Sequence, residues 1–179
     1  MDKEFLTFTY KIPKEPSKNR VAVWRLIKEL GAVYLQQGVV LLPYNEDLYS
    51  VLRNLREQVN AFGGRATLGI IRFLNEEDEK DIVAEFIKQI DEEYEEFIRN
   101  CQHFVDEIDT ERTQGDFSFS EIIEHEEEYK KFQRWYETIT KKSYFKSEQQ
   151  VHAIEILKKA KLRLQDFSNE VYQRDENNR

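Results

Sequence analysis

Hydrophobic and polar residues follow two different patterns along this chain, and the change falls near residue 74. In the first part, short apolar runs with β-type spacing alternate with helical spacing, and turn residues separate them. All three prolines and five of the six glycines lie before residue 70. In the second part, apolar residues recur every three or four positions over long stretches, which is typical of helices. The pattern predicts a mixed domain over residues 1–74 and a helical extension over residues 75–179.

The first part carries a local signal at most boundaries between its secondary-structure elements. Ser17 and Asn45 are residue types that favour helix N-caps, while Gly31 and Gly63-Gly64 are typical of helix ends. The expected elements, in chain order, are a strand over 5–12, a helix over 17–30, a hairpin of strands 32–36 and 39–42, a helix over 46–62 and a strand over 65–73. This β-α-β-β-α-β order predicts an α+β domain of the ferredoxin-like type.

The second part predicts three long antiparallel helices joined by short loops. Apolar residues keep a heptad spacing from Val83 to Ile108, and residues 109–117 are expected to form a loop. Ser118 with Glu121, and Ser147 with Gln150, have the spacing of a capping box. The apolar faces expected for the two later helices are Ile122, Tyr129, Phe132, Tyr136 and Ile139, and then Val151, Ile154, Leu157, Leu164 and Val171.

Composition narrows the class of protein. The chain has 179 residues, of which 40% are hydrophobic, so it can build a sizeable core. No apolar run approaches the 18 or so residues that a membrane span requires, so no membrane partner is expected. Cys101 is the only cysteine, which excludes an internal disulfide and favours a reducing compartment. We therefore expect a cytoplasmic protein.

Charge is distributed unevenly along the chain. Residues 1–73 hold 11 Lys/Arg and 7 Asp/Glu, a net charge of +4, whereas the whole chain carries −8. Five cations surround the start of the first helix: Lys14, Lys18, Arg20, Arg25 and Lys28. Such cations, with the free N–H groups of residues 17–20, are suited to bind DNA phosphates. The alternative is a solvated helix face, or pairing with the Glu-rich helices.

Catalytic and metal-binding patterns are weak. Glu121, His125 and Glu128 share one helical face, but the Glu-x-x-His pattern of helix-bundle metal sites fails because Ile122 occupies the glutamate position. His125 falls in phase with the apolar face, so we expect a histidine at the core edge. No metal, no cofactor and no enzymatic activity are expected. Trp24 and Trp135 lie beside apolar faces, and we expect them to pack in the core.

Three segments resemble a known family. "IPKEPSKNRVAVWRLIKELGAVYLQQGVVLLP", "EYEEFIRNCQHFVDEI" and "GDFSFSEIIEHEEEYKKFQRWYETI" are similar to the N-terminal domain of ChrB, the chromate-responsive regulator of bacterial chromate-efflux operons. The resemblance implies a DNA-associated, transcription-regulatory role in chromate resistance. The alternative is a non-catalytic interaction or dimerisation module, with a second copy or another protein as partner. ChrB carries a further C-terminal domain associated with the chromate response. If chromate is sensed there, we expect this chain not to sense it.

A weaker resemblance covers residues 5–73 and links them to the central domain of PaaX-type repressors. That domain is similar in turn to the small ferredoxin-like nuclease subunit of CRISPR adaptation machinery. In that nuclease the first strand ends in an aspartate that binds the catalytic metal. Lys11 stands at the matching step here, and an ammonium group cannot ligate a hard divalent cation. The resemblance therefore does not imply nuclease activity for this chain.

Overall fold

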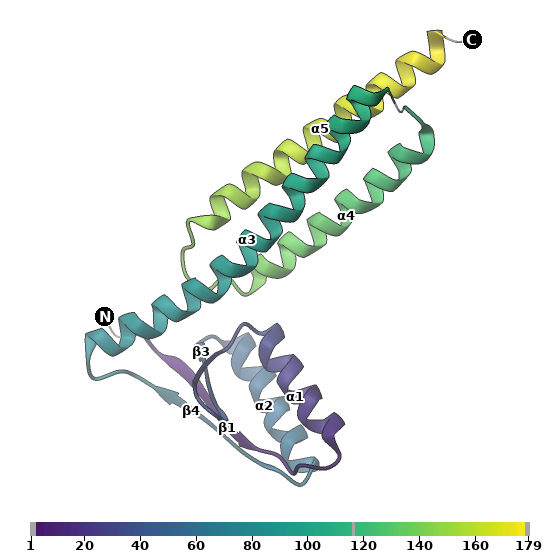
Figure 1. The fold of residues 1–179 in the computed structure, drawn as a ribbon. Coiled ribbons are helices and arrows are strands. Elements are labelled where there is room, and N and C mark those ends of the chain that lie inside the picture. Colours follow the sequence, from purple (N-terminus) through teal and green to yellow (C-terminus); the bar gives the residue numbers. More distant parts are fainter. Residues whose placement is uncertain (1–2, 116, 178–179) are drawn as a thin grey trace. The chain divides into compact units, whose positions relative to one another are not determined.

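The computed structural model describes residues 3–115 and 117–177, which form an α+β structure with a four-stranded antiparallel sheet and five helices (Figure 1). The elements in chain order are β1 (Phe5–Lys11), α1 (Ser17–Glu29), β2 (Val33–Gln36), β3 (Val39–Pro43), α2 (Glu46–Ala61), β4 (Arg65–Ile71), α3 (Glu76–Gln114), α4 (Phe119–Lys141) and α5 (Gln149–Asn177). Within the described part of the chain, no helix has the length and apolar character needed to cross a membrane.

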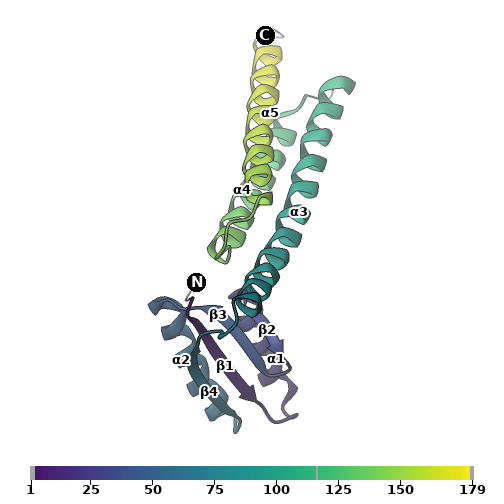
Figure 2. The same cartoon turned by 90° about the vertical axis from the view of Figure 1, so that its left-hand side faces the viewer.

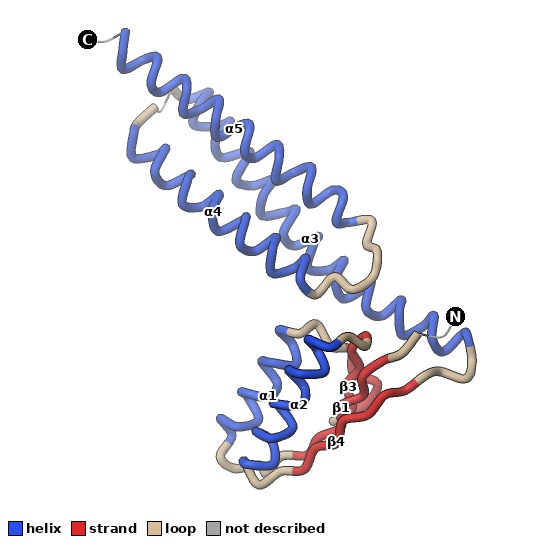
Figure 3. Tube along the Cα trace, turned by 180° about the vertical axis from the view of Figure 1, so that it is seen from behind, coloured by secondary structure: helices blue, strands red, loops and turns tan. Residues whose placement is uncertain are grey.

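The sheet has the strand order β2-β3-β1-β4, so β1 lies between two antiparallel neighbours. Phe8, for example, lies opposite Val40 of β3 and Leu68 of β4. Helices α1 and α2 lie together on one face of this sheet (Figure 3). The predicted β-α-β-β-α-β element order is confirmed, and Gly38 turns the β2–β3 hairpin with φ of 75°.

The chain divides into two compact units. The first runs to Gln89 and includes Lys142–Phe145. It reaches beyond residue 74 because Phe86 of α3 stacks on Phe5 of β1, with ring centroids 6.3 Å apart. Tyr144 also belongs to this unit, and its hydroxyl donates a 2.6 Å hydrogen bond to the Leu30 carbonyl. The Phe86 ring joins the start of α3 to the first core, and the Tyr144 hydrogen bond joins the loop of residues 142–145 to α1.

The second unit contains the rest of α3 together with α4 and α5, which run side by side (Figure 2). All three helices contribute to one core, which is rich in aromatic rings. Phe97 of α3 packs edge-on against Phe132 and Trp135 of α4, with centroids 6.0 and 5.4 Å away. The expectation that Trp135 packs in the core is confirmed. The fully buried members are Tyr94, Phe97, Cys101, Phe104, Val105, Ile108, Ile139, Ala153, Ala160 and Phe167.

The apolar residues of the predicted heptad seam of α3 are divided between two hydrophobic cores. Val83 of the seam contacts the first core, as does Phe86 beside it, while Ile90 and the seam residues after it pack into the second core. The predicted loop over residues 109–117 is wrong, because α3 continues to Gln114. The Thr110 and Thr113 hydroxyls each donate a hydrogen bond to the backbone carbonyl four residues earlier in the helix. Gly115, with φ of 77°, marks the actual end of the helix.

The predicted buried face of α5 is also partly wrong. Val151 and Ile154 are 52% and 38% exposed, whereas Ala153 and Ala160 are fully buried. Alanine lets neighbouring helices approach closely, so the small residues define the packed face although they contribute little to an apolar pattern. Leu164 and Val171 are buried as expected.

Three of the four predicted N-cap residues accept a side-chain hydrogen bond at the start of their helix. The Asn45 side chain accepts a 2.8 Å hydrogen bond from the Leu48 N–H, which confirms this N-cap. Ser118 and Ser147 accept from the N–H groups three residues later, at 3.2 and 3.3 Å. The predicted Ser17 cap is wrong, because Ser17 is the first residue of α1 and Pro16 precedes it without a side-chain cap.

Candidate functional site

The cations around the first helix are all exposed to solvent. We call Lys14, Lys18, Arg20, Arg25 and Lys28 the basic cluster, and all five side chains are exposed. Val23 and Ile27 supply the buried face of α1, which turns the cationic positions toward solvent.

Among the described residues of the first unit, no ion pair involves any of the five cations. Across the described residues of the first unit, ion pairs involve other residues, such as Lys3 with Glu79 and Arg56 with Glu57. The basic cluster therefore keeps its positive charge available to an external anion on this face.

The N-terminus of α1 is less open to an anion than the sequence suggests. The Ser17 N–H lies 3.3 Å from a carboxylate oxygen of Glu15, and the Asn19 N–H donates a 3.1 Å bond to the Pro16 carbonyl. Glu15 thus already places a negative charge where the helix dipole would attract a phosphate. The side chains of the basic cluster, more than the backbone donors, must bind an incoming polyanion.

Strand pairing places two more cations, Lys11 and Arg65, side by side where β1 ends and β4 begins. Lys11 at the end of β1 lies opposite Arg65 at the start of β4, and both side chains are exposed. The chain enters α1 shortly after Lys11, so these two residues border the basic cluster. Sequence reasoning missed Arg65 because it lies far from the cluster in the chain, and only the strand register connects them.

Trp24 lies in the exposed surface of α1 rather than in the core. Its side chain is 49% exposed, and the Lys28 Nζ lies 5.2 Å from its ring centroid, within the range of a cation–π contact. The expectation that Trp24 packs in the core is therefore wrong. Its neighbour is the basic cluster, so the exposed ring is available to the same ligand.

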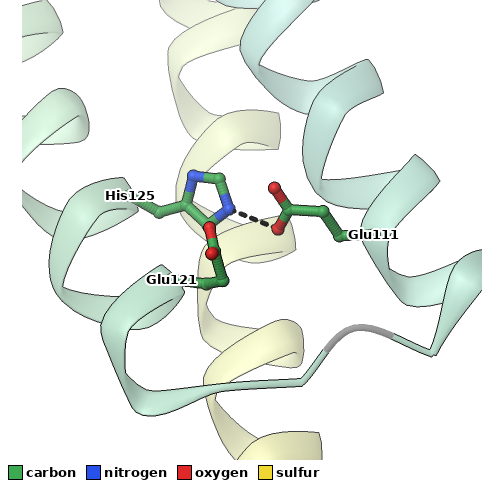
Figure 4. A group of neighbouring side chains, drawn as sticks. All are labelled: Glu111, Glu121 and His125. Carbon is green, nitrogen blue, oxygen red and sulfur yellow. Dashed lines mark hydrogen bonds and ion pairs between the residues drawn. The ribbon is translucent and has the colours of Figure 1, made fainter.

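A second group of polar side chains lies in the second unit. His125 Nε2 lies 2.7 Å from a carboxylate oxygen of Glu111, and Glu121 completes the group (Figure 4). The expected core position of His125 is confirmed, since its side chain is buried. Glu121 and His125 were recognised in the sequence, but Glu111 was missed because its segment was expected to be a loop. Glu128, which the sequence placed beside them, is not part of this group.

The comparisons with known proteins place the chain in a family. A family model described as "Protein ChrB, N-terminal" matches residues 20–178. The chain belongs to this family. Its members are associated with chromate resistance, so this is a chromate-resistance-associated protein. No curated protein and no solved structure matches the chain. The ChrB N-terminal match begins at Arg20 and therefore includes Arg25 and Lys28, while Lys14 and Lys18 lie just before it.

Proposed function

We propose that this ChrB-family chain binds DNA phosphates through the basic cluster and acts as a non-catalytic, transcription-regulatory protein. The observation that carries the proposal is the exposure of five cations on one helix and its approach, without ion-pair partners among the residues of their unit that the structure describes. Lys11 and Arg65 extend this positive edge. The exposed Trp24 ring adds a surface on which a base or sugar can stack.

We further propose that the strand order β2-β3-β1-β4 represents a ferredoxin-like domain, followed by a three-helix extension. In such a domain α1 packs on one face of the sheet through Val23 and Ile27, and its outer side faces solvent. Residues 74–179 hold 16 Lys/Arg and 28 Asp/Glu, a net charge of −12, and DNA would repel them. The charge difference between the two parts of the chain therefore favours contact through α1.

The salt dependence of binding gives this proposal a magnitude. Each neutralised phosphate contributes about −0.9 to the slope of log affinity against log salt, so five contacts give a slope of roughly −4.5. Affinity would then fall roughly 500-fold as salt rises from 50 to 200 mM. A single chain is expected to bind weakly at physiological salt, and a second copy would strengthen the binding.

Fluorescence anisotropy of a labelled chromate-operon promoter tests the proposal at several salt concentrations. Arg20→Ala and Arg25→Ala should each reduce the slope by about 0.9. Arg56→Ala is the matched control, because Arg56 is an exposed cation of the same unit that pairs with Glu57 at 3.4 Å. The proposal fails if the wild-type protein does not bind at low salt, or if all three variants bind as it does.

A second function is favoured by a separate observation. Val151, Ile154 and Leu162 lie on one side of α5 and are 52%, 38% and 61% exposed. An apolar strip of this kind is suited to a homodimer or to another protein partner. Light scattering after size-exclusion chromatography distinguishes the states: Leu162→Glu should convert a dimer to a monomer. The dimerisation role is contradicted if the wild type and Leu162→Glu have the same mass and both still bind DNA.

A further inference from the structure

We propose that Glu111, Glu121 and His125 form a binding site for a divalent first-row transition cation such as Zn²⁺ (Figure 4). This inference does not rest on DNA binding, because the three residues lie in the second unit and the basic cluster in the first. It concerns a ligand for which the sequence alone gave too weak a pattern.

The secondary structure brings the three ligands together. Glu111 lies in the last turns of α3, which sequence patterns had assigned to a loop. Glu121 and His125 lie in the first turns of α4, four residues apart, so they share one helical face. One ligand atom from each side chain can be chosen so that all three atoms lie within 4.8 Å of one another.

The imidazole is held in place before any ligand arrives. His125 is only 3% exposed, and its ring packs edge-on against Phe104 and Phe167, with centroids 5.5 Å away in each case. Its Nε2 atom points at Glu111. Two carboxylates therefore converge on one buried, fixed nitrogen atom, and a cation at this point would balance their repulsion in a site partly shielded from water.

The distances require only a small rearrangement. Ligand atoms at about 2.0–2.1 Å from a metal lie roughly 3.3–3.4 Å apart in a tetrahedral site and roughly 2.8–3.0 Å apart in an octahedral one. The Glu111–His125 pair, now 2.7 Å apart, must open slightly so that the metal replaces the proton of this hydrogen bond, which is released to solvent. Glu121 must move inward by at most about 2.0 Å, from 4.8 to about 2.8 Å. Its side chain is only partly buried, so rotation is possible.

The donor set indicates the class of cation. Imidazole nitrogen with two carboxylates suits Zn²⁺, Co²⁺, Ni²⁺ and Mn²⁺, whereas Ca²⁺ and Mg²⁺ prefer oxygen ligands alone. Three protein ligands leave at least one coordination position for water or another small ligand. Affinities should rise in the order Mn²⁺, Co²⁺, Ni²⁺, as they do for most nitrogen and oxygen sites.

Isothermal titration of the chelator-treated full chain with ZnCl₂ tests the site, and Co²⁺ absorbance reports its coordination. One Zn²⁺ per chain is expected. His125→Gln should abolish this binding, and Glu121→Gln should weaken it at least tenfold. His152→Gln is the matched control, because His152 lies 3.7 Å from Glu155 in an exposed histidine–carboxylate pair on α5. This control should bind as the wild type does.

Glu121→Gln keeps the test decisive if His125→Gln does not fold, because it leaves the Glu111–His125 contact in place. The proposal is overturned if the wild type shows no 1:1 binding. It is equally overturned if Glu121→Gln retains wild-type affinity, or if His152→Gln removes the binding. In those cases Glu111 and His125 form a hydrogen-bonded pair that only joins α3 to α4.

Discussion

Replacing Glu15 by glutamine should change folding stability and DNA affinity in opposite directions. The Glu15 carboxylate lies 3.3 Å from the Ser17 N–H at the start of α1. In this position it interacts favourably with the helix dipole, yet it also repels any phosphate that approaches the basic cluster. Glutamine has nearly the same shape and retains a hydrogen-bond acceptor, but it removes the charge.

The two effects have different magnitudes. Loss of an exposed carboxylate at a helix N-terminus costs about 0.5 kcal/mol of folding free energy. A phosphate roughly 6 Å from the carboxylate experiences a repulsion of about 0.7 kcal/mol in water, so its removal should raise affinity about threefold at low salt. The gain should fall to roughly 1.7-fold at 0.15 M salt, because a Debye length of about 8 Å screens a repulsion over 6 Å by about half.

Urea unfolding and DNA anisotropy, measured on the same protein samples, provide the two readouts. Asp47→Asn is the matched control, since Asp47 is an exposed carboxylate in the first turn of α2. Phe5 pairs with Pro43, so α2 begins near the start of β1, whereas α1 begins after its end. The two helix starts are therefore separated by about 20 Å, the length of a seven-residue strand. Asp47→Asn should lower stability to a similar extent and leave DNA affinity unchanged.

The reasoning is refuted if Glu15→Gln leaves affinity unchanged or lowers it at low salt. It is also refuted if Asp47→Asn raises affinity as much as Glu15→Gln does. Either result would mean that the phosphates do not approach the start of α1.

Three further predictions concern the cores and the absence of catalysis. Burial, with the Glu128 carboxylate nearby, raises the pKa of the Cys101 thiol from 9.0 to about 12. The folded state therefore holds the thiol proton above pH 9, and the stability advantage of wild type over Cys101→Ala should shrink by about 1.4 kcal/mol per pH unit from pH 9 toward 12 in urea titrations. Gly64→Ala would place Cβ 2.5 Å from the Lys11 carbonyl oxygen, so the unfolding free energy should fall by about 2 kcal/mol, whereas Gly69→Ala meets its nearest atom at 3.4 Å and should cost less. Purified protein with Mg²⁺ or Mn²⁺ should not cleave RNA or duplex DNA, because Lys11 ends β1; metal-dependent cleavage that copurifies with the protein would contradict this.

Local chemistry in the sequence was sufficient to predict the element order of the first unit. Asn45 caps α2 through a hydrogen bond that spans only three residues, and Gly38 turns the hairpin through its own φ angle. Gly31, with φ of 66°, follows the end of α1 in the same way. Such signals act within one turn of chain, so they can be read before any tertiary contact is known. The positions of the basic cluster could also be predicted, because exposure on α1 follows from the apolar spacing of Val23 and Ile27.

Tertiary structure alone decided which side chains meet across elements. Glu111 contacts His125 because α3 extends to Gln114 and lies beside α4, and no local spacing connects the two residues. Ala153 and Ala160 became the packed face of α5 through the close approach of neighbouring helices, while the larger Val151 remained exposed. Arg65 joined the positive edge only through its strand register with Lys11. Burial and pairing depend on the surface that the neighbouring element presents, and a hydrophobic pattern within one element does not contain that surface.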